Sequence, residues 1–137
     1  MTTSSYYQIC TTNPINLSHK TQTKMFNSIK INDIVLNTET KESFEKLPEV
    51  ILIEVSEIVD DDKFCFKYDD KVFSKVIGLI AKNMIEFLDN KMFINFAFEE
   101  FMRVNNTNQV SIYLKDAENG ELIKIDELKI YINYNLL

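Results

Sequence analysis

Glycine, histidine and cysteine are scarce in this chain, and each scarcity excludes a kind of site. The 137 residues include two Gly, two Cys, one His and no Trp. With only Gly78 and Gly120, neither of the glycine-rich phosphate-binding motifs, G-x-G-x-x-G and G-x-x-x-x-G-K, can be present. The nucleotide sites that depend on these motifs are therefore excluded.

His19 is the only histidine, so any Ser/His/Asp or Cys/His catalytic group would have to include it. It lies in a polar stretch whose nearest acidic residue is Asp33, and we interpret it as an exposed loop residue. Cys10 and Cys65 match no metal or redox spacing, and we expect each to act as a small buried apolar side chain. The sequence predicts no catalytic residue, no metal site and no cofactor.

Arginine and long apolar runs are also lacking. The longest apolar run, residues 76–81, is far shorter than the roughly 20 residues of a membrane-spanning helix, and residues 1–12 do not resemble a secretory signal. A single Arg and a formal net charge of −6 disfavour nucleic acid as a partner, because phosphates are bound by clustered Lys and Arg. We expect a cytoplasmic protein with no membrane and no nucleic-acid partner.

Apolar residues are abundant enough to build a core. Hydrophobic residues make up 45% of the chain, which excludes disorder caused by low hydrophobicity. A chain of this length usually forms one domain. We therefore expect residues 1–137 to form a single globular domain.

Alternating and continuous apolar patterns predict strands at residues 5–10, 26–36, 110–115 and 128–134, with a loop at 15–24 and a hairpin turn at 116–120. Residues 26–36 fit either one strand or a tight hairpin that turns at Asn32-Asp33. Residues 40–47 predict a short helix capped by Thr40. Residues 50–55 are almost entirely apolar, which is typical of a strand in the middle of a sheet. Residues 63–68 are expected to return beside that strand as an antiparallel hairpin.

Two helices are predicted in the second half of the chain. Apolar residues recur at helical spacing over residues 71–88, and Asp69 and Asp70 stand where they could cap that helix. Residues 92–103 fit both periods, but their high helix propensity favours a second helix. The sequence thus predicts an α+β fold in which a mostly antiparallel sheet of about five to seven strands packs against helix 71–88 and helix 92–103.

Acidic charge is concentrated in one stretch. Residues 39–70 contain eleven acids and four lysines, a net charge of −7, whereas residues 1–38 carry +2 and residues 71–137 carry −1. Most of these acids are explained by expected helices and strands. The remaining ones predict a partner-binding acidic patch made of Glu57, Asp60, Asp61 and Asp62. Residues 59–70 contain no Gly, so they do not form an EF-hand calcium loop.

Local negative charge accelerates association with a cationic surface. Our main functional hypothesis is a small acidic protein-binding module, an inhibitor of the immunity-protein or antitoxin type, that neutralises a basic partner such as a toxin by stoichiometric binding. One alternative is a structural or assembly subunit of a phage, a virus or an oligomer. In that case a homodimer would form through the C-terminal strand, residues 131–137, if that strand lies at a sheet edge. A second alternative is a carboxylate-based enzyme, whose candidate residues are Glu54, Glu57, Glu99 and Tyr68.

Overall fold

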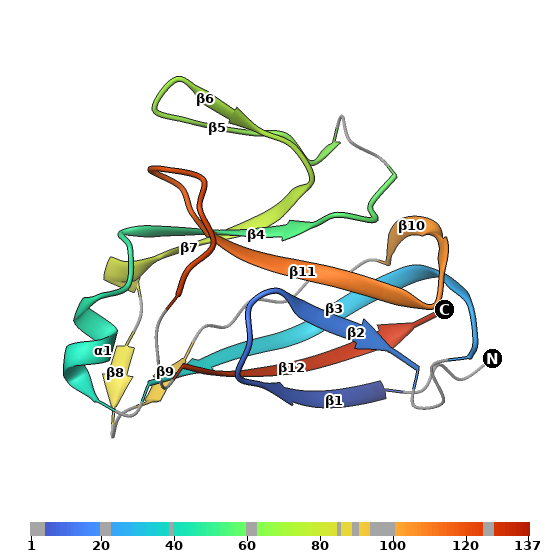
Figure 1. Ribbon diagram of the computed structural model, residues 1–137, viewed down its shortest axis with the longest axis horizontal. Coiled ribbons are helices and arrows are strands. Elements are labelled where there is room, and N and C mark those ends of the chain that lie inside the picture. The colour runs from blue at the N-terminus through green and yellow to red at the C-terminus, as the bar shows by residue number, and fades with distance from the viewer. Residues whose placement is uncertain are drawn as a thin grey trace.

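Two antiparallel sheets pack face to face in a computed structural model of the chain (Figure 1). The structure describes residues 5–19, 23–38, 40–59, 63–84, 86–88, 91–93, 101–124 and 128–137. Sheet A has the order β1-β12-β3-β9-β8, with β10 also paired to β3; sheet B has the order β2-β11-β4-β7. A separate hairpin is formed by β5 and β6.

The elements have the following bounds. The strands of sheet A are β1 (Ser5–Cys10), β3 (Phe26–Asn37), β8 (Glu86–Leu88), β9 (Lys91–Phe93), β10 (Met102–Thr107) and β12 (Lys129–Leu136). Those of sheet B are β2 (Ile15–Ser18), β4 (Val50–Val55), β7 (Val76–Ala81) and β11 (Gln109–Asp116). The remaining elements are helix α1 (Lys41–Glu45), β5 (Phe66–Tyr68), β6 (Lys71–Phe73) and the short 3-10 helix η2 (Lys82–Met84).

The strand order is that of a jelly roll. Without the β5–β6 hairpin and the short pair β8 and β9, eight strands remain, ordered β1-β12-β3-β10 in one sheet and β2-β11-β4-β7 in the other. Numbered along the chain, these are strands 1-8-3-6 and 2-7-4-5, the order of two interlocked Greek keys. This fold carries many unrelated functions, so it describes the scaffold and not the activity.

Side-chain alternation explains the core between the sheets. In β12 every second residue, from Ile130 to Leu136, is buried, and the residues between them are more exposed. In β3 the alternation shifts between Ile31 and Ile34, both of which are fully buried. The cause is a bulge: Asn133 pairs with Asp33 but Tyr134 pairs with Ile31, which leaves Asn32 as an extra residue. Residues 26–37 are thus one bent strand and not a hairpin that turns at Asn32.

Several sequence predictions are confirmed. The strand at residues 5–10 is β1, and helix α1 begins after Thr40, whose hydroxyl accepts a hydrogen bond from Ser43 N at 3.1 Å. Strand β4 lies between β11 and β7, in the interior of its sheet as expected. The expected loop at 15–24 is wrong in part, because Ile15 and Leu17 are fully buried in β2.

The long helix predicted for residues 71–88 is wrong. The structure is mostly β, with 60% strand and 8% helix, and no described helix reaches seven residues. Residues 71–88 form β6, β7, η2 and β8 instead. The uninterrupted apolar run VIGLIA is typical of a buried strand as well as of a helix, and pairing with β4 decides between them. The fold is therefore a β sandwich, and the α+β prediction is wrong.

The second predicted helix and the predicted pairing of residues 63–68 are also wrong. Residues 92–93 belong to β9 and residues 102–103 to β10, while residues 94–100 lie outside the described part of the chain. Strand β5 pairs with β6 and not with β4, whose neighbours are β11 and β7. None of the helices that the structure describes is long and apolar enough to cross a membrane.

The C-terminal strand is not at a sheet edge. Strand β12 pairs with β1 along one side and with β3 along the other, so both of its edges are used within the chain. A homodimer formed by edge pairing of residues 131–137 is therefore not supported. Strand β7 is the longer of the two edge strands of sheet B, and β1 is an edge strand of sheet A.

Candidate partner-binding surface

Glu57, the one described member of the predicted acidic patch, has a structural role. Its carboxylate accepts hydrogen bonds from the backbone N–H of Ser111, at 2.9 and 3.2 Å, and from the Ser56 hydroxyl at 2.9 Å. Its own carbonyl accepts from Asn105 N at 3.0 Å. Glu57 thus links the end of β4 to β10 and β11. The other three members, Asp60, Asp61 and Asp62, lie outside the described residues.

A different group of acids comes together at the tip of the β5–β6 hairpin. Asp69 and Asp70 form its two-residue turn with φ angles of 51° and 66°. Two positive φ values in succession are typical of a type I′ turn, whose backbone twist matches that of the two flanking strands. Asp is one of the few residue types that commonly adopt positive φ in such a turn. Sequence reasoning placed these two residues at the start of a helix, whereas they turn the chain back on itself.

The second acidic segment is the turn after β11. The Asp116 carboxylate accepts a hydrogen bond from Glu118 N at 2.8 Å, and Asn119 accepts one from Glu121 N at 2.9 Å. Gly120 has a φ of 74° and donates to Asp116 O at 2.7 Å. These local hydrogen bonds fix the backbone and leave the side chains of Glu118 and Glu121 exposed.

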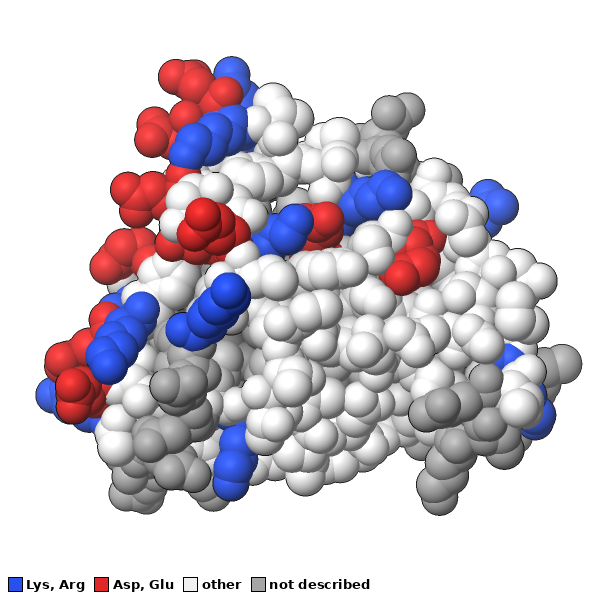
Figure 2. All heavy atoms as spheres, in the orientation of Figure 1, with Lys and Arg blue, Asp and Glu red and all other residues white. Residues whose placement is uncertain are grey.

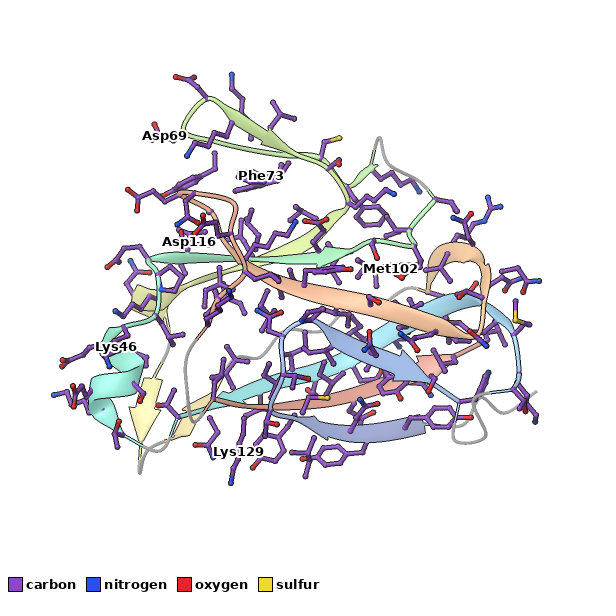
Figure 3. The ribbon with its side chains drawn as sticks, in the orientation of Figure 1. Lys46, Asp69, Phe73, Met102, Asp116 and Lys129 are labelled. Atoms are coloured by element: carbon purple, nitrogen blue, oxygen red, sulfur yellow. The ribbon has the colours of Figure 1, made fainter. Side chains whose placement is uncertain are left out.

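A small core holds the hairpin against this turn. Leu52 and Ala117, both fully buried, and Val76 pack with the half-buried rings of the hairpin, among them Phe73. The Lys71 ammonium donates to the carbonyl of Glu118. Figure 3 shows Asp69, Phe73 and Asp116 on the same side of the molecule, with Phe73 between the hairpin and the sheet.

We name the five acids of these two turns the acidic tip: Asp69, Asp70, Asp116, Glu118 and Glu121. The segments 66–73 and 116–121 contain only two lysines, Lys67 and Lys71, so five acids minus two bases give a net charge of −3. In the described part of the chain the one salt bridge joins Lys115 to Glu54 at 2.7 Å, outside the tip. Figure 2 shows acidic side chains along the left border of the molecule, from the β5–β6 hairpin to α1.

His19 is not the exposed loop residue that the sequence suggested. Its ring makes edge contacts with Tyr6 and Phe26, and its Nδ1 lies 2.8 Å from the Tyr6 hydroxyl. Burial, and secondarily the positive charge of Lys24, lowers the pKa of His19 below its ordinary value of 6.5. The neighbouring ring of Tyr134 stacks on Tyr6, and burial raises its pKa above 10.0. This cluster fills the side of the sandwich between β1 and β2.

The residues proposed for a carboxylate enzyme are not brought together as one site. Glu54 pairs with Lys115, Glu57 holds the backbone of β11, and Tyr68 stacks on Phe66 at 6.4 Å between ring centroids. Glu99 lies outside the described residues. In the part of the chain that the structure describes, no three His, Cys, Asp or Glu side chains are grouped so that they could hold a metal ion.

The three acids of the second turn are not among the site residues predicted from the sequence. Residues 116–120 predict a turn, but its charges lie far in sequence from the acidic stretch at 39–70. The signal that could have found them is the proximity of β11 and β4, which are neighbours in sheet B. Comparisons with protein-family models, with curated proteins and with solved structures found no match for this chain.

Proposed function

We propose that this protein is a small binding module that captures a basic protein partner through the acidic tip, in the manner of an immunity protein or antitoxin. The observation that supports this proposal is the convergence of two acidic turns, from hairpin β5–β6 and from the end of β11, held together by the core around Leu52. We place the protein in the cytoplasm and assign it no enzymatic activity.

One of the two lysines of the tip segments, Lys71, supports this proposal because its ammonium donates to a backbone carbonyl, that of Glu118, and not to a carboxylate. Outside the tip, Lys82 likewise donates to the carbonyls of Glu45 at 2.7 Å and Leu47 at 3.1 Å. Fixed turns also hold the acids in place before binding. A preorganised acidic surface of this kind attracts a cationic partner over several ångströms and selects against acidic ones.

The test removes charge without removing the turn. Asp69→Asn combined with Asp70→Gly gives Asn-Gly, the most favoured type I′ sequence, and Glu118→Gln removes one more charge. We expect this triple variant to remain folded and to bind a basic partner, captured from the source cells with the unchanged protein, about tenfold more weakly, chiefly through slower association. Binding of the unchanged protein should weaken as salt is added, because exposed charges are screened.

Two matched variants decide where the partner binds. Glu42→Gln with Glu45→Gln removes charge from α1, and Asp60, Asp61 and Asp62 changed to Asn removes charge from the patch predicted by sequence. If the acidic tip is the site, both variants keep at least half of the affinity. Unchanged binding by the tip variant would contradict the proposal, and loss of binding in the Asp60 to Asp62 variant alone would assign the site to that segment.

A second candidate function is an assembly subunit, which the exposed apolar side chains of β1 favour. Jelly rolls form viral capsid and lectin domains among others. On the outer face of sheet A, Tyr7 and Ile9 are exposed to 63% and 56%. Tyr7 lies 6.3 Å from Tyr131 between ring centroids. Large particles seen by light scattering of the purified protein, lost on Tyr7→Ser and Ile9→Ser, would favour this function over the first.

A further inference from the structure

Strand β7 is an apolar strand at the border of sheet B. It pairs with β4 through residues 76 and 78–81, and no other named strand of the described chain pairs with its far side. All six of its residues are uncharged, and none is a proline. Natural proteins usually protect such an edge with Lys, Pro or a short strand, since the free N–H and C=O groups can pair with another strand. The opposite border, β2, is shorter, with four residues, and includes Asn16 and Ser18.

The hydrogen bonds next to β7 show which of its backbone groups point outward. Lys82 N donates to Glu49 O at 2.8 Å, which places residue 82 in a hydrogen-bonded pair with β4. In an antiparallel ladder such pairs alternate, so Ile80 faces β4 with its N–H and C=O, whereas Leu79 and Ala81 face away. At the other end of the strand Val76 N already donates to Phe64 O at 2.9 Å. The outward backbone groups in this part of the strand are therefore those of Leu79 and Ala81.

This segment is complementary to a second copy of itself. We propose that two molecules associate by antiparallel pairing of their β7 strands, with Leu79 opposite the partner's Leu79 and Ala81 opposite the partner's Ile77. The outward groups of Leu79 and Ala81 then bond across the interface, and the two four-stranded sheets become one. This proposal does not use the acidic tip and stands independently of the proposed function.

Two further observations point to a second copy as the occupant. The Leu79 side chain is 41% exposed on the outer face of sheet B, so two of them would cover each other across the two-fold axis. In a chain of net charge −6, an uncharged strand is a place where two copies can approach without placing like charges opposite each other. A two-fold axis also makes the contact self-limiting, because each copy uses its β7 once.

Sedimentation velocity of the intact chain over a range of concentrations tests the proposal. We expect the mass to rise from 16.1 kDa towards twice that value as concentration increases. Leu79→Lys places like charges at the axis, and Leu79→Pro removes an outward N–H without removing a bond to β4. Each should raise the dissociation constant of the dimer at least about tenfold. Val72→Lys is the matched control, because Val72 is 72% exposed on β6, away from this edge.

The same samples distinguish the other possible occupants of the edge. Amide hydrogen exchange at Leu79 and Ala81 should slow as the dimer forms. Protection of these amides that does not depend on concentration would mean that the chain covers its own edge, and it would overturn the proposal. A chain that stays monomeric at every concentration, or a dimer that both Leu79 variants leave intact, would overturn it too. Added salt should not weaken this dimer, unlike binding at the acidic tip, so the two proposals can fail separately.

Discussion

Ile53 and Leu52 are neighbours on β4 and equally buried, but they belong to different parts of the molecule. Ile53 points into the core between the two sheets, which collects buried side chains from ten segments or more of the chain, whereas Leu52 points outward and is covered by the β5–β6 hairpin. Among the described residues, Val76 and Ala117 are the buried ones that join Leu52 in the second core. The large core supports the sandwich, and the small one positions the acidic tip. Stability and binding can therefore be changed separately.

Truncation of a side chain in each core should have the largest effect on stability. Ile53→Ala should lower the free energy of unfolding by about 4 kcal/mol, because the surrounding sheets cannot close the cavity. Leu52→Ala should cost about 2 kcal/mol, since the hairpin can settle onto the smaller side chain. Urea unfolding followed by circular dichroism measures both. Hydrogen exchange should show faster exchange of residues 66–73 in Leu52→Ala alone; equal losses without this local change would mean that the two cores act as one.

A polar contact also belongs to the sandwich, and its removal should have the next largest effect. The Asn13 amide donates to Leu114 O at 2.8 Å and to Ile123 O at 3.0 Å, and it accepts from Leu114 N at 3.1 Å. Asn13→Ala leaves these half-buried backbone groups unpaired, so it should cost about 2 kcal/mol in urea unfolding. Asn106→Ala, at an exposed position of β10, is the control and should stay within about 0.5 kcal/mol. Equal effects of the two changes would contradict the role of Asn13.

Changes at Glu57 test whether this acid has a structural role and not a role in binding. Glu57→Ala removes the acceptor of Ser111 N and should lower the free energy of unfolding by about 1 kcal/mol, while Glu57→Gln keeps an acceptor and should lose less. Neither change should alter binding of a basic partner by the folded protein. If Glu57→Gln binds several-fold more weakly at full stability, Glu57 belongs to the binding surface after all.

The smallest expected effect concerns pH. Because the pKa of His19 is lowered in the folded state, the unfolded chain takes up this proton first as pH falls. The contribution of His19 to stability is therefore full above its ordinary pKa of 6.5 and is lost as pH falls through the lower, folded value. His19→Gln, which can still accept from Tyr6, should flatten the fall in stability below pH 6.5 in urea unfolding. An unchanged slope would assign that pH dependence to other groups.

The sequence predicted the strands whose side chains alternate or are all buried, but it did not predict how they pair. The strands predicted at residues 50–55 and 128–134 correspond to β4 and β12, because at least one face of each is apolar throughout. Residues 76–81 fall within the predicted helix 71–88 because apolar residues recur at helical spacing over that longer segment, and six consecutive apolar residues fit a helix as well as a strand. Only the partner β4, distant in sequence, decides that these residues form a strand.

The candidate site was less predictable than the fold for the same reason. The local sequence around Asp69 and Asp70 suits a helix start as well as a type I′ turn. Their association with Glu118 requires β11 to lie beside β4, a contact between residues about 60 positions apart. A patch predicted from the density of acids along the chain therefore includes Glu57, whose carboxylate bonds to the backbone of β11, and omits Glu121.

The segment that carries the β5–β6 hairpin leaves sheet B and returns to it at neighbouring positions. The whole segment can therefore be exchanged for another. Val55 N donates to Lys75 O at 3.0 Å, so residues 56–75 leave sheet B and return to it at one point. Changing the length or sequence of such an excursion alters the cost of closing it only slowly, by about 0.6 kcal/mol per doubling. During evolution, or in the laboratory, the excursion can be exchanged while the jelly roll is kept, provided that the new segment covers Leu52 and retains the contacts of Glu57 and Ile58 with β10 and β11. New specificities could then arise on an unchanged frame.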